Sequence, residues 1–268
     1  SEEFKNLSEQ TEILIDEVKI KSQSGKINYI GTNSSSKFFK LNKVVSQKEC
    51  NDIINLIKSE KLKTDPDSVD GMSTYEYYIL SPDLTETENE HRQKIKNIVQ
   101  PIIDKRITPF LRKFYSKNCD KNRLCTPFYS LIRRYNPKDR LSHSTHRDGH
   151  AYATVVISLS EYNVDFRGGL YIASSYRNRK IIPLGKGDAI VHRNDLLHGV
   201  KVKNDGGTRW SWIIWFKDSI DGKDYSINWH KEKALKGCAV AQSLYAGSRG
   251  TIEEMLMWYF KSANQGLS

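Results

Sequence analysis

Four residues in the second half of the chain have the types and spacing of a metal site with an anion-binding group beside it. His146 and Asp148 stand two residues apart, so on an extended strand both side chains point to the same face. His198 lies on a second apolar segment bounded by turns, and Arg209 follows it by eleven residues. Two neutral imidazoles and one carboxylate leave three positions open on an octahedral metal, a ligand set that suits Fe(II). The pattern predicts a facial metal triad with a guanidinium nearby for an anion.

Three other histidines compete for the same role. His143 and His150 bracket His146 but have no carboxylate at the same spacing. His192 is followed by a polar run, Arg193 to Asp195, which is typical of a loop. We therefore assign the metal site to the three residues whose combined geometry fits iron: His146, Asp148 and His198.

Short strands must position this site. From Thr126 onward, apolar and β-branched runs alternate with turns rich in Gly, Asn and Asp, and no ten-residue helix separates them. A parallel sheet with helical crossovers is therefore unexpected, and a sandwich or barrel is predicted. The predicted strands are residues 128–135, 151–159, 168–172, 180–184, 189–192, 198–202 and 210–216.

The first half of the chain predicts helices that brace this sheet. Ser46 and Glu49 form a capping box in front of an apolar helix face. Residues 86–117 have helical periodicity, interrupted at Pro101 and Pro109. Residues 1–36 are polar, and we interpret them as a loosely attached arm. The fold class is thus α+β and mainly β.

The chain ends in two amphipathic helical segments, residues 230–245 and 251–263, around a glycine-containing turn. The small and aromatic residues of these segments, from Ala234 to Gly266, resemble a Sel1-type helical repeat. One repeat cannot build a solenoid, because repeats gain their stability by stacking on neighbours. We therefore expect a helical hairpin that caps the barrel.

Composition restricts the class of protein and its partners. With 38% apolar residues the chain is globular, and no apolar run approaches the roughly 20 residues of a membrane span. The net charge of +10 accompanies no Lys/Arg block with interleaved aromatics, so we expect a small anionic partner and no nucleic acid or membrane. The four cysteines show no CxxC spacing, which favours reduced thiols. We expect a soluble, intracellular protein. If the chain had an upstream targeting segment, we expect that it has been removed. The sequence does not indicate an oligomeric state.

Residues 135–216 resemble the Fe(II)- and 2-oxoglutarate-dependent dioxygenases, and within them the prolyl 4-hydroxylase-like branch. No single piece is specific, but their combination is. The matching pieces are Tyr135, His146-Arg147-Asp148, Phe166-Arg167-Gly168-Gly169, Pro183 with Gly187-Asp188-Ala189, His198-Gly199-Val200 and Arg209-Trp210-Ser211-Trp212.

This resemblance implies a double-stranded β-helix, a jelly-roll relative of the cupins. It implies that the triad binds Fe(II), and that Arg209, Tyr135 and Ser211 contact 2-oxoglutarate, with O2 as the second co-substrate. We place Thr154, on the predicted strand 151–159, with these co-substrate contacts. The domains are then a polar arm at 1–36, a dioxygenase domain at 37–228 and a Sel1-like segment at 229–268.

The sequence departs from the branch at two positions. Procollagen-type prolyl hydroxylases usually carry lysine where Arg209 stands, and Ser158 occupies the place of a co-substrate-binding tyrosine in some relatives. Because Asp148 is present, iron has no vacant ligand position for halide, which argues against a halogenase.

The resemblance implies oxidation of an unactivated C–H bond, by hydroxylation or oxidative cyclisation, with release of succinate and CO2. The basic balance favours a small, acidic, amino-acid-derived metabolite as substrate. Two alternatives stay open: a peptidyl (prolyl) hydroxylase, and a non-catalytic cupin-like binding protein, which the intact triad opposes.

Several side chains are candidates for substrate contact. Arg133 and Tyr129 share the face of Tyr135 by strand periodicity, although a register slip would turn Arg134 inward instead. We expect Arg147, between two ligands, to face away from the metal in a surface ion pair. The other candidates at the mouth of the site are His150, Arg193, Tyr171 and Tyr176.

Overall fold

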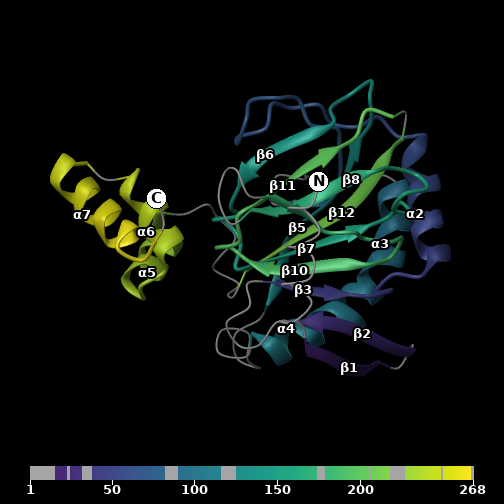
Figure 1. The fold of residues 1–268 in the computed structure, drawn as a ribbon, viewed down its shortest axis with the longest axis horizontal. Coiled ribbons are helices and arrows are strands. Elements are labelled where there is room, and N and C mark those ends of the chain that lie inside the picture. Colours follow the sequence, from purple (N-terminus) through teal and green to yellow (C-terminus); the bar gives the residue numbers. More distant parts are fainter. Residues whose placement is uncertain are drawn as a thin grey trace, which may run out of the picture.

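The strands form two antiparallel sheets (Figure 1). The computed structural model describes residues 16–22, 25–31, 38–81, 90–115, 125–173, 179–205, 207–217, 227–248 and 250–266. The larger sheet has the order β1-β2-β3-β10-β7-β12-β5-β4 and the smaller one the order β6-β11-β8-β9. The predicted mainly β architecture of antiparallel strands is confirmed. The strands of the larger sheet are β1 (Asp16–Ser22), β2 (Gly25–Gly31), β3 (Phe38–Leu41), β4 (Glu76–Leu80), β5 (Thr126–Tyr135), β7 (Ala153–Ser158), β10 (Ala189–Arg193) and β12 (Arg209–Lys217), and those of the smaller sheet are β6 (Ser142–His146), β8 (Gly168–Ala173), β9 (Arg179–Ile181) and β11 (His198–Val202).

Side-chain alternation divides the larger sheet into two faces. Along β12, Trp212 and Ile214 point into the main hydrophobic core, while Arg209, Ser211 and Ile213 point into a cavity between the sheets. This is the two-residue period of an extended strand. The face opposite the core is therefore free to carry polar chemistry.

Helices cover the core face of the larger sheet. They are α2 (Gln47–Lys58), α3 (Glu90–Ile102), a π-helical turn (Ile103–Ile107) and α4 (Thr108–Phe114). The capping box at the start of α2 is confirmed, with Glu49 N–H donating to Ser46 Oγ at 3.2 Å and Ser46 N–H to Glu49 Oε2 at 2.7 Å. Each buried aliphatic side chain on these helices contributes about 1.5–3 kcal/mol relative to an exposed one. Their packing makes the sheet a rigid support for the site on its other face.

The irregularity predicted at the two prolines lies between them. Helix α3 continues through Pro101 to Ile102, and the π-helical turn follows it. Pro109 lies in the first turn of α4, directly after the π-helical turn.

Part of the predicted N-terminal arm is sheet. Strands β1 and β2 pair antiparallel, and β2 pairs with β3, with Tyr29 opposite Leu41. Residues 16–22 and 25–31 therefore extend the larger sheet, because their backbone groups bond to its edge. The rest of the arm lies outside the described residues, and the domain boundary at residues 36 and 37 stays a prediction.

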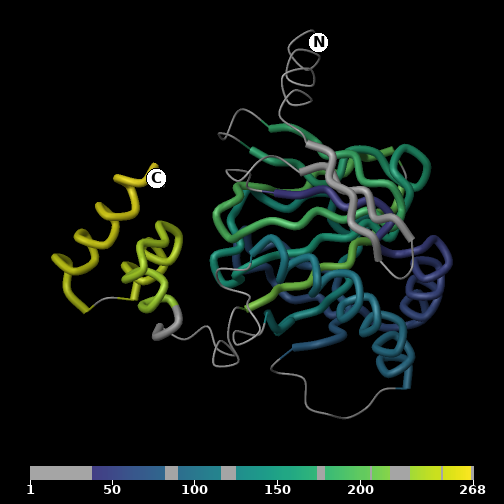
Figure 2. Tube along the Cα trace, turned by 90° about the horizontal axis from the view of Figure 1, so that it is seen from below, coloured from purple at the N-terminus to yellow at the C-terminus, as the bar shows by residue number. Residues whose placement is uncertain are grey.

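The C-terminal segment has three helices where two were predicted: α5 (Ile227–Leu235), α6 (Ala239–Ala246) and α7 (Ile252–Ala263). Gly237 divides the first predicted segment, because its φ of +87° is left-handed backbone that ends a helix and suits glycine. Tyr245 and Trp258 pack edge to face between α6 and α7. Figure 2 shows these helices beside the sheets. The Sel1-type assignment stays a prediction.

The cysteines correct one expectation. Cys50 and Cys238 are free, but Cys125 is disulfide-bonded. Sequence spacing missed this bond because a disulfide depends on the distance between Cα atoms in the fold. Disulfides persist mainly in oxidising compartments, so the bond weakens the argument for an intracellular location, which stays a prediction. Within the described ranges, none of the helices has the length and apolar character needed to cross a membrane.

Candidate active site

The two histidines of the predicted triad meet across a pair of strands. His146 ends β6 and lies opposite His198, the first residue of β11. Asp148 follows two residues after β6, with its carboxylate oxygens 3.4 Å from His146 Nε2 and 3.6 Å from His198 Nε2. One donor atom from each of the three residues lies within 4.8 Å of the others. The structure thus brings together two imidazoles and one carboxylate.

Hydrogen bonds behind the triad orient its donor atoms. His146 Nδ1 lies 2.7 Å from the carbonyl of Ser144, and His198 Nδ1 lies 3.0 Å from that of Leu196. A carbonyl only accepts, so each Nδ1 carries the proton and each Nε2 keeps its lone pair for a metal. Thr154 donates to Asp148 Oδ2 at 2.6 Å and so holds the carboxylate, and its expected contact with the co-substrate stays a prediction.

The protonation states suit a divalent metal. Burial lowers the pKa of His198 to about 3, so its imidazole is neutral near pH 7. Burial alone would raise the pKa of Asp148, but the neighbouring His198 and His146 hold it well below its usual value. Burial alone would lower the pKa of His146, but its hydrogen bond to Asp148 raises it, so metal binding at Nε2 would have to displace a more tightly held proton there. Two imidazoles and one ionised carboxylate are the ligand set that favours Fe(II) with open positions.

A fourth histidine lies beside the triad. His192 is fully buried on β10, with its Nε2 3.8 Å from Asp148 Oδ2 and its ring 4.4 Å from that of His198. Among the described residues, Nε2 has no hydrogen-bond partner. The polar run after His192 predicts a loop, but the structure places this residue on β10. The available signal was its alternation with the inward-facing Ile190.

The other end of the cavity carries a buried cation without a counterion. Arg209 is 1% exposed, and its Nη1 donates to Ser211 Oγ at 3.1 Å. Its guanidinium lies 5.5 Å from the ring centre of Tyr135, the residue opposite it on β5. Among the described residues, no carboxylate lies within ion-pair distance of Arg209, and Nη2 has no hydrogen-bond partner. Ser211, Tyr135 and Arg209 therefore form one polar group in the cavity wall.

This orphaned guanidinium fits a carboxylate ligand. Burial lowers the pKa of Arg209 to about 10, so the side chain is still charged near pH 7. An unpaired buried charge is strongly unfavourable unless something compensates it. A dicarboxylate that chelates a metal at one end and meets Arg209 at the other would do so, which is how 2-oxoglutarate would fit.

One cavity of about 410 Å³ connects the triad with Arg209. Its inner wall is aliphatic, from residues such as Val156, Leu170 and Ile213. Sequence reasoning missed two parts of its lining, which come from segments distant in the chain: Asp67, Ser68 and Val69 from the loop before β4, and His230, Val240, Ser243 and Leu244 from α5 and α6.

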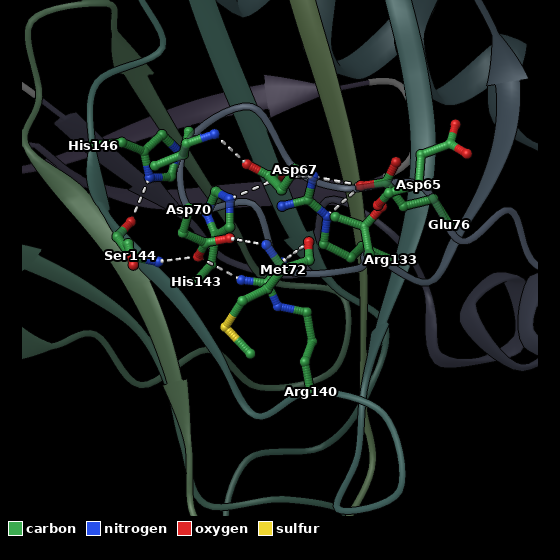
Figure 3. A network of polar contacts seen from close by, with 12 residues as sticks. Asp65, Asp67, Asp70, Met72, Glu76, Arg133, Arg140, His143, Ser144 and His146 are labelled. Atoms are coloured by element: carbon green, nitrogen blue, oxygen red, sulfur yellow. Dashed lines mark hydrogen bonds and ion pairs between the residues drawn. The ribbon is translucent and has the colours of Figure 1, made fainter.

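Arg133 faces this cavity, which settles the register of its strand. Arg134 points the other way and pairs with Asp139 at 2.6 Å. However, Arg133 Nε donates to Glu76 Oε1 at 2.6 Å, and its Nη2 lies 3.5 Å from Asp67 Oδ2 (Figure 3). Both carboxylates offset its charge. Arg133 is therefore a structural cation and a poor candidate for binding a substrate carboxylate.

Two carboxylates, Asp67 and Asp70, fasten the loop before β4 to the metal site (Figure 3). Asp67 Oδ2 lies 3.0 Å from His143 Nε2, and the His143 ring is 4.3 Å from that of His146 at 84°. Asp70 accepts from Arg140 Nη2 at 2.7 Å and from the backbone N–H of Ser144 at 3.1 Å. The loop thus supports the strand that carries His146.

Some of the remaining candidates for substrate contact line the cavity, and others do not. His150 lines the cavity, and its ring meets that of Trp215 at 4.4 Å. Tyr129 packs behind Trp215 and does not line the cavity. Tyr171 lies on the far face of β8, bonded to Thr145 Oγ1 at 2.7 Å, and Arg193 is exposed over the Tyr152 ring. Tyr176 lies outside the described residues.

Arg147 corrects another expectation. The residue lines the cavity, and its Nε is buried without a hydrogen-bond partner. No carboxylate of the described residues makes an ion pair with it, so the expected surface ion pair is not formed. Strand alternation failed here because β6 ends at His146, one residue earlier.

Comparison with known proteins gives the fold. No family model matches the sequence, and no curated protein matches it. Among solved structures, a 2OG-Fe(II) oxygenase family oxidoreductase from Burkholderia pseudomallei is 19% identical, with a TM-score of 0.50, covering 68% of this chain and 86% of that one. A prolyl hydroxylase from Trichoplax adhaerens, solved with a hypoxia inducible factor peptide, is 15% identical, with a TM-score of 0.50 and coverage of 72% and 88%. The expected double-stranded β-helix is thereby confirmed: this chain has the fold of the 2OG-Fe(II) oxygenases, with a His-Asp-His triad on its strands.

Proposed function

We propose that this protein is an Fe(II)- and 2-oxoglutarate-dependent oxygenase that oxidises an unactivated C–H bond of a small, acidic, amino-acid-derived metabolite. The observation that carries the proposal is the pair of features in one cavity: a buried triad of two imidazoles and a carboxylate, and the uncompensated Arg209 beyond it. A buried cation without an ion-pair partner among the described residues opposes folding, so the stability of the fold does not account for Arg209.

Iron and 2-oxoglutarate, when bound, supply the oxidising power, so that substrate C–H, O2 and 2-oxoglutarate give C–OH, succinate and CO2 in a hydroxylation. The chain's own residues do the rest. His146, Asp148 and His198 would hold the metal, and Thr154 fixes the carboxylate by its hydrogen bond. Arg209 and Ser211 would bind the distant carboxylate of 2-oxoglutarate. The aliphatic wall excludes water, which would otherwise compete for the open metal positions.

The acidic substrate is supported by Arg147. This half-buried cation lines the cavity next to two ligands and has no ion-pair partner among the described residues. A substrate carboxylate would compensate it, as 2-oxoglutarate would compensate Arg209. The cavity of about 410 Å³ lies near the lower end of the range for small-molecule sites, and 2-oxoglutarate would take part of it.

The test is a screen for succinate formation with Fe(II), 2-oxoglutarate and O2, in which acidic amino-acid derivatives are compared with proline-containing peptides. We expect stimulation by members of the first set. In the variant Arg147→Gln, we expect the KM for a stimulating acid to rise at least tenfold with little change in the affinity for 2-oxoglutarate. Arg167→Gln is the matched control, because Arg167 does not line this cavity.

The screen also separates the alternatives. Stimulation by peptides alone would favour a peptidyl hydroxylase, the activity of the Trichoplax neighbour. The absence of any Fe(II)-dependent succinate release would favour a non-catalytic binding protein and would overturn the proposal.

A further inference from the structure

We infer that the C-terminal helices are part of the substrate site, with α6 as its outer wall. Val240, Ser243 and Leu244 of this helix line the cavity that holds the triad, and His230 of α5 lines it as well. The role of this wall in choosing a substrate rests on the proposed oxygenase function, whereas its contact with the metal site does not.

The contact is made at Gly149, the residue after the metal-ligand candidate Asp148. A Cβ atom at this position would overlap Leu244 Cδ1 and would lie 3.0 Å from Val240 Cγ1. A side chain at position 149 would therefore force Leu244 out of its place against the turn that carries the carboxylate. Glycine at 149 allows two elements that are distant in sequence to pack directly on each other.

Further contacts fix the segment to the same end of the sheets. Asn194 Nδ2, just after β10, donates to Cys238 Sγ at 3.5 Å in front of α6. Lys233 Nζ of α5 lies 5.4 Å from the centre of the Tyr152 ring. Gly149 and Tyr152 follow Asp148 by one and four residues, and Asn194 precedes His198 by four, so the segment packs on the chain segments that carry the triad. Figures 1 and 2 both place α5 and α6 next to that end of the strands.

Leu244 packs on the site rather than inside the helical segment. It is 44% exposed and does not belong to the apolar cluster that joins α6 to α7. Its side chain lies against Gly149 and lines the cavity. Leu256 on α7 has the same residue type and 45% exposure but does not line the cavity, which makes it a matched control.

The side chains that line this wall indicate which class of substrate fits the cavity. Two aliphatic side chains and one hydroxyl on α6 lie in the same cavity as Trp215 and the unpaired Arg147. A substrate with a short hydrocarbon body and one anionic group matches this lining, whereas a folded protein or a long peptide needs an open groove. We therefore assign to α6 the selection of small substrates by size.

The contact is tested first, without any substrate. Leu244→Asp places a carboxylate against Gly149 and near Asp148, whereas Leu256→Asp places one in solvent on α7. By hydrogen–deuterium exchange on the full chain, we expect at least tenfold faster exchange in residues 146–152 and 238–246 for Leu244→Asp, and no change there for Leu256→Asp. Equal exchange in the two variants would overturn the inference.

Selection is tested with the milder Leu244→Ala, using the acidic amino-acid derivatives of the succinate screen as probes. We expect the ratio of kcat/KM for larger to smaller acids to rise at least fivefold, while Leu256→Ala keeps the wild-type ratio. An unchanged ratio in Leu244→Ala would overturn the selective role. If exchange changes as expected but no acid is oxidised in any variant, then the proposed function fails and the packing of α6 stands.

Discussion

Two buried arginines on neighbouring strands face the same cavity in opposite electrostatic states. Arg133 on β5 is bonded to Glu76 and lies within ion-pair distance of Asp67. Among the described residues, Arg209 on β12 has the hydroxyl of Ser211 as its hydrogen-bond partner and no carboxylate partner, and the rings of Tyr135 and Phe166 lie beside it. The first is compensated within the chain, and the second is not. The difference separates a cation that holds the fold from a cation that is available to a ligand.

The largest effect is expected from removing the charge of Arg209, the cation without a carboxylate partner among the described residues. Arg209→Met should weaken 2-oxoglutarate binding on the order of 100-fold or more, because two charge-assisted hydrogen bonds are lost. The same variant should unfold at equal or higher denaturant concentration without ligands, since an unpaired buried charge is removed. Calorimetric titration and urea unfolding measure the two effects.

Arg209→Lys is the control for charge. It keeps the cation but not the planar fork, so its affinity for 2-oxoglutarate should fall between those of the wild type and Arg209→Met. Loss of stability in Arg209→Met by several kcal/mol would contradict the distinction between the two arginines.

Removing the carboxylate partner of Arg133 should lower the stability of the fold. Glu76→Gln leaves Arg133 without its main partner in a buried position, which should reduce the free energy of unfolding by about 3–5 kcal/mol. Urea unfolding at pH 7 measures this loss. Glu49→Gln in the partly exposed pair with Arg106 is the comparison, and a smaller loss is expected there. Similar losses in both variants would mean that the Arg133 pair has no special role.

A smaller effect sharpens the role of Thr154. Thr154→Val keeps the shape of the side chain but removes the hydrogen bond to Asp148, so the affinity for Fe(II) or Mn(II) should fall by about 10–100-fold. Metal titration under anaerobic conditions measures this change. If 2-oxoglutarate affinity fell instead while metal affinity was kept, then Thr154 would be a co-substrate contact as the sequence first suggested.

The smallest effect concerns the loop that fastens to β6. Asp70→Asn weakens the bonds to Arg140 and Ser144 without touching the metal ligands, and should reduce the free energy of unfolding by about 1–2 kcal/mol. Thermal unfolding measures it. An unchanged midpoint would show that the loop is held mainly by Asp67.

Sequence reasoning was most successful where local periodicity carries the information. The sheet-forming strands, the capping box of α2, and the grouping of His146, Asp148 and His198 with Arg209 follow from alternation and residue type within short segments. His192 was within reach of the same argument, because it alternates with Ile190 on β10.

The parts that were missed depend on contacts between distant segments. Asp67 and Glu76 meet Arg133 across more than fifty residues, so the charge of Arg133 could not be judged from its own strand. Arg147 was misjudged because its strand ends at His146, and strand ends are poorly fixed by sequence. The packing of α6 against Gly149 likewise could not be predicted from the sequence, because a glycine in a turn does not indicate which distant segment packs over it.

The most direct measurement is an anaerobic calorimetric titration of 2-oxoglutarate into the full chain with and without Fe(II), repeated in His198→Ala. The account predicts tight binding only when Fe(II) and the intact triad are both present, because one end of the ligand is held by the metal and the other by Arg209. Equal binding without metal, or undiminished binding in His198→Ala, would contradict it.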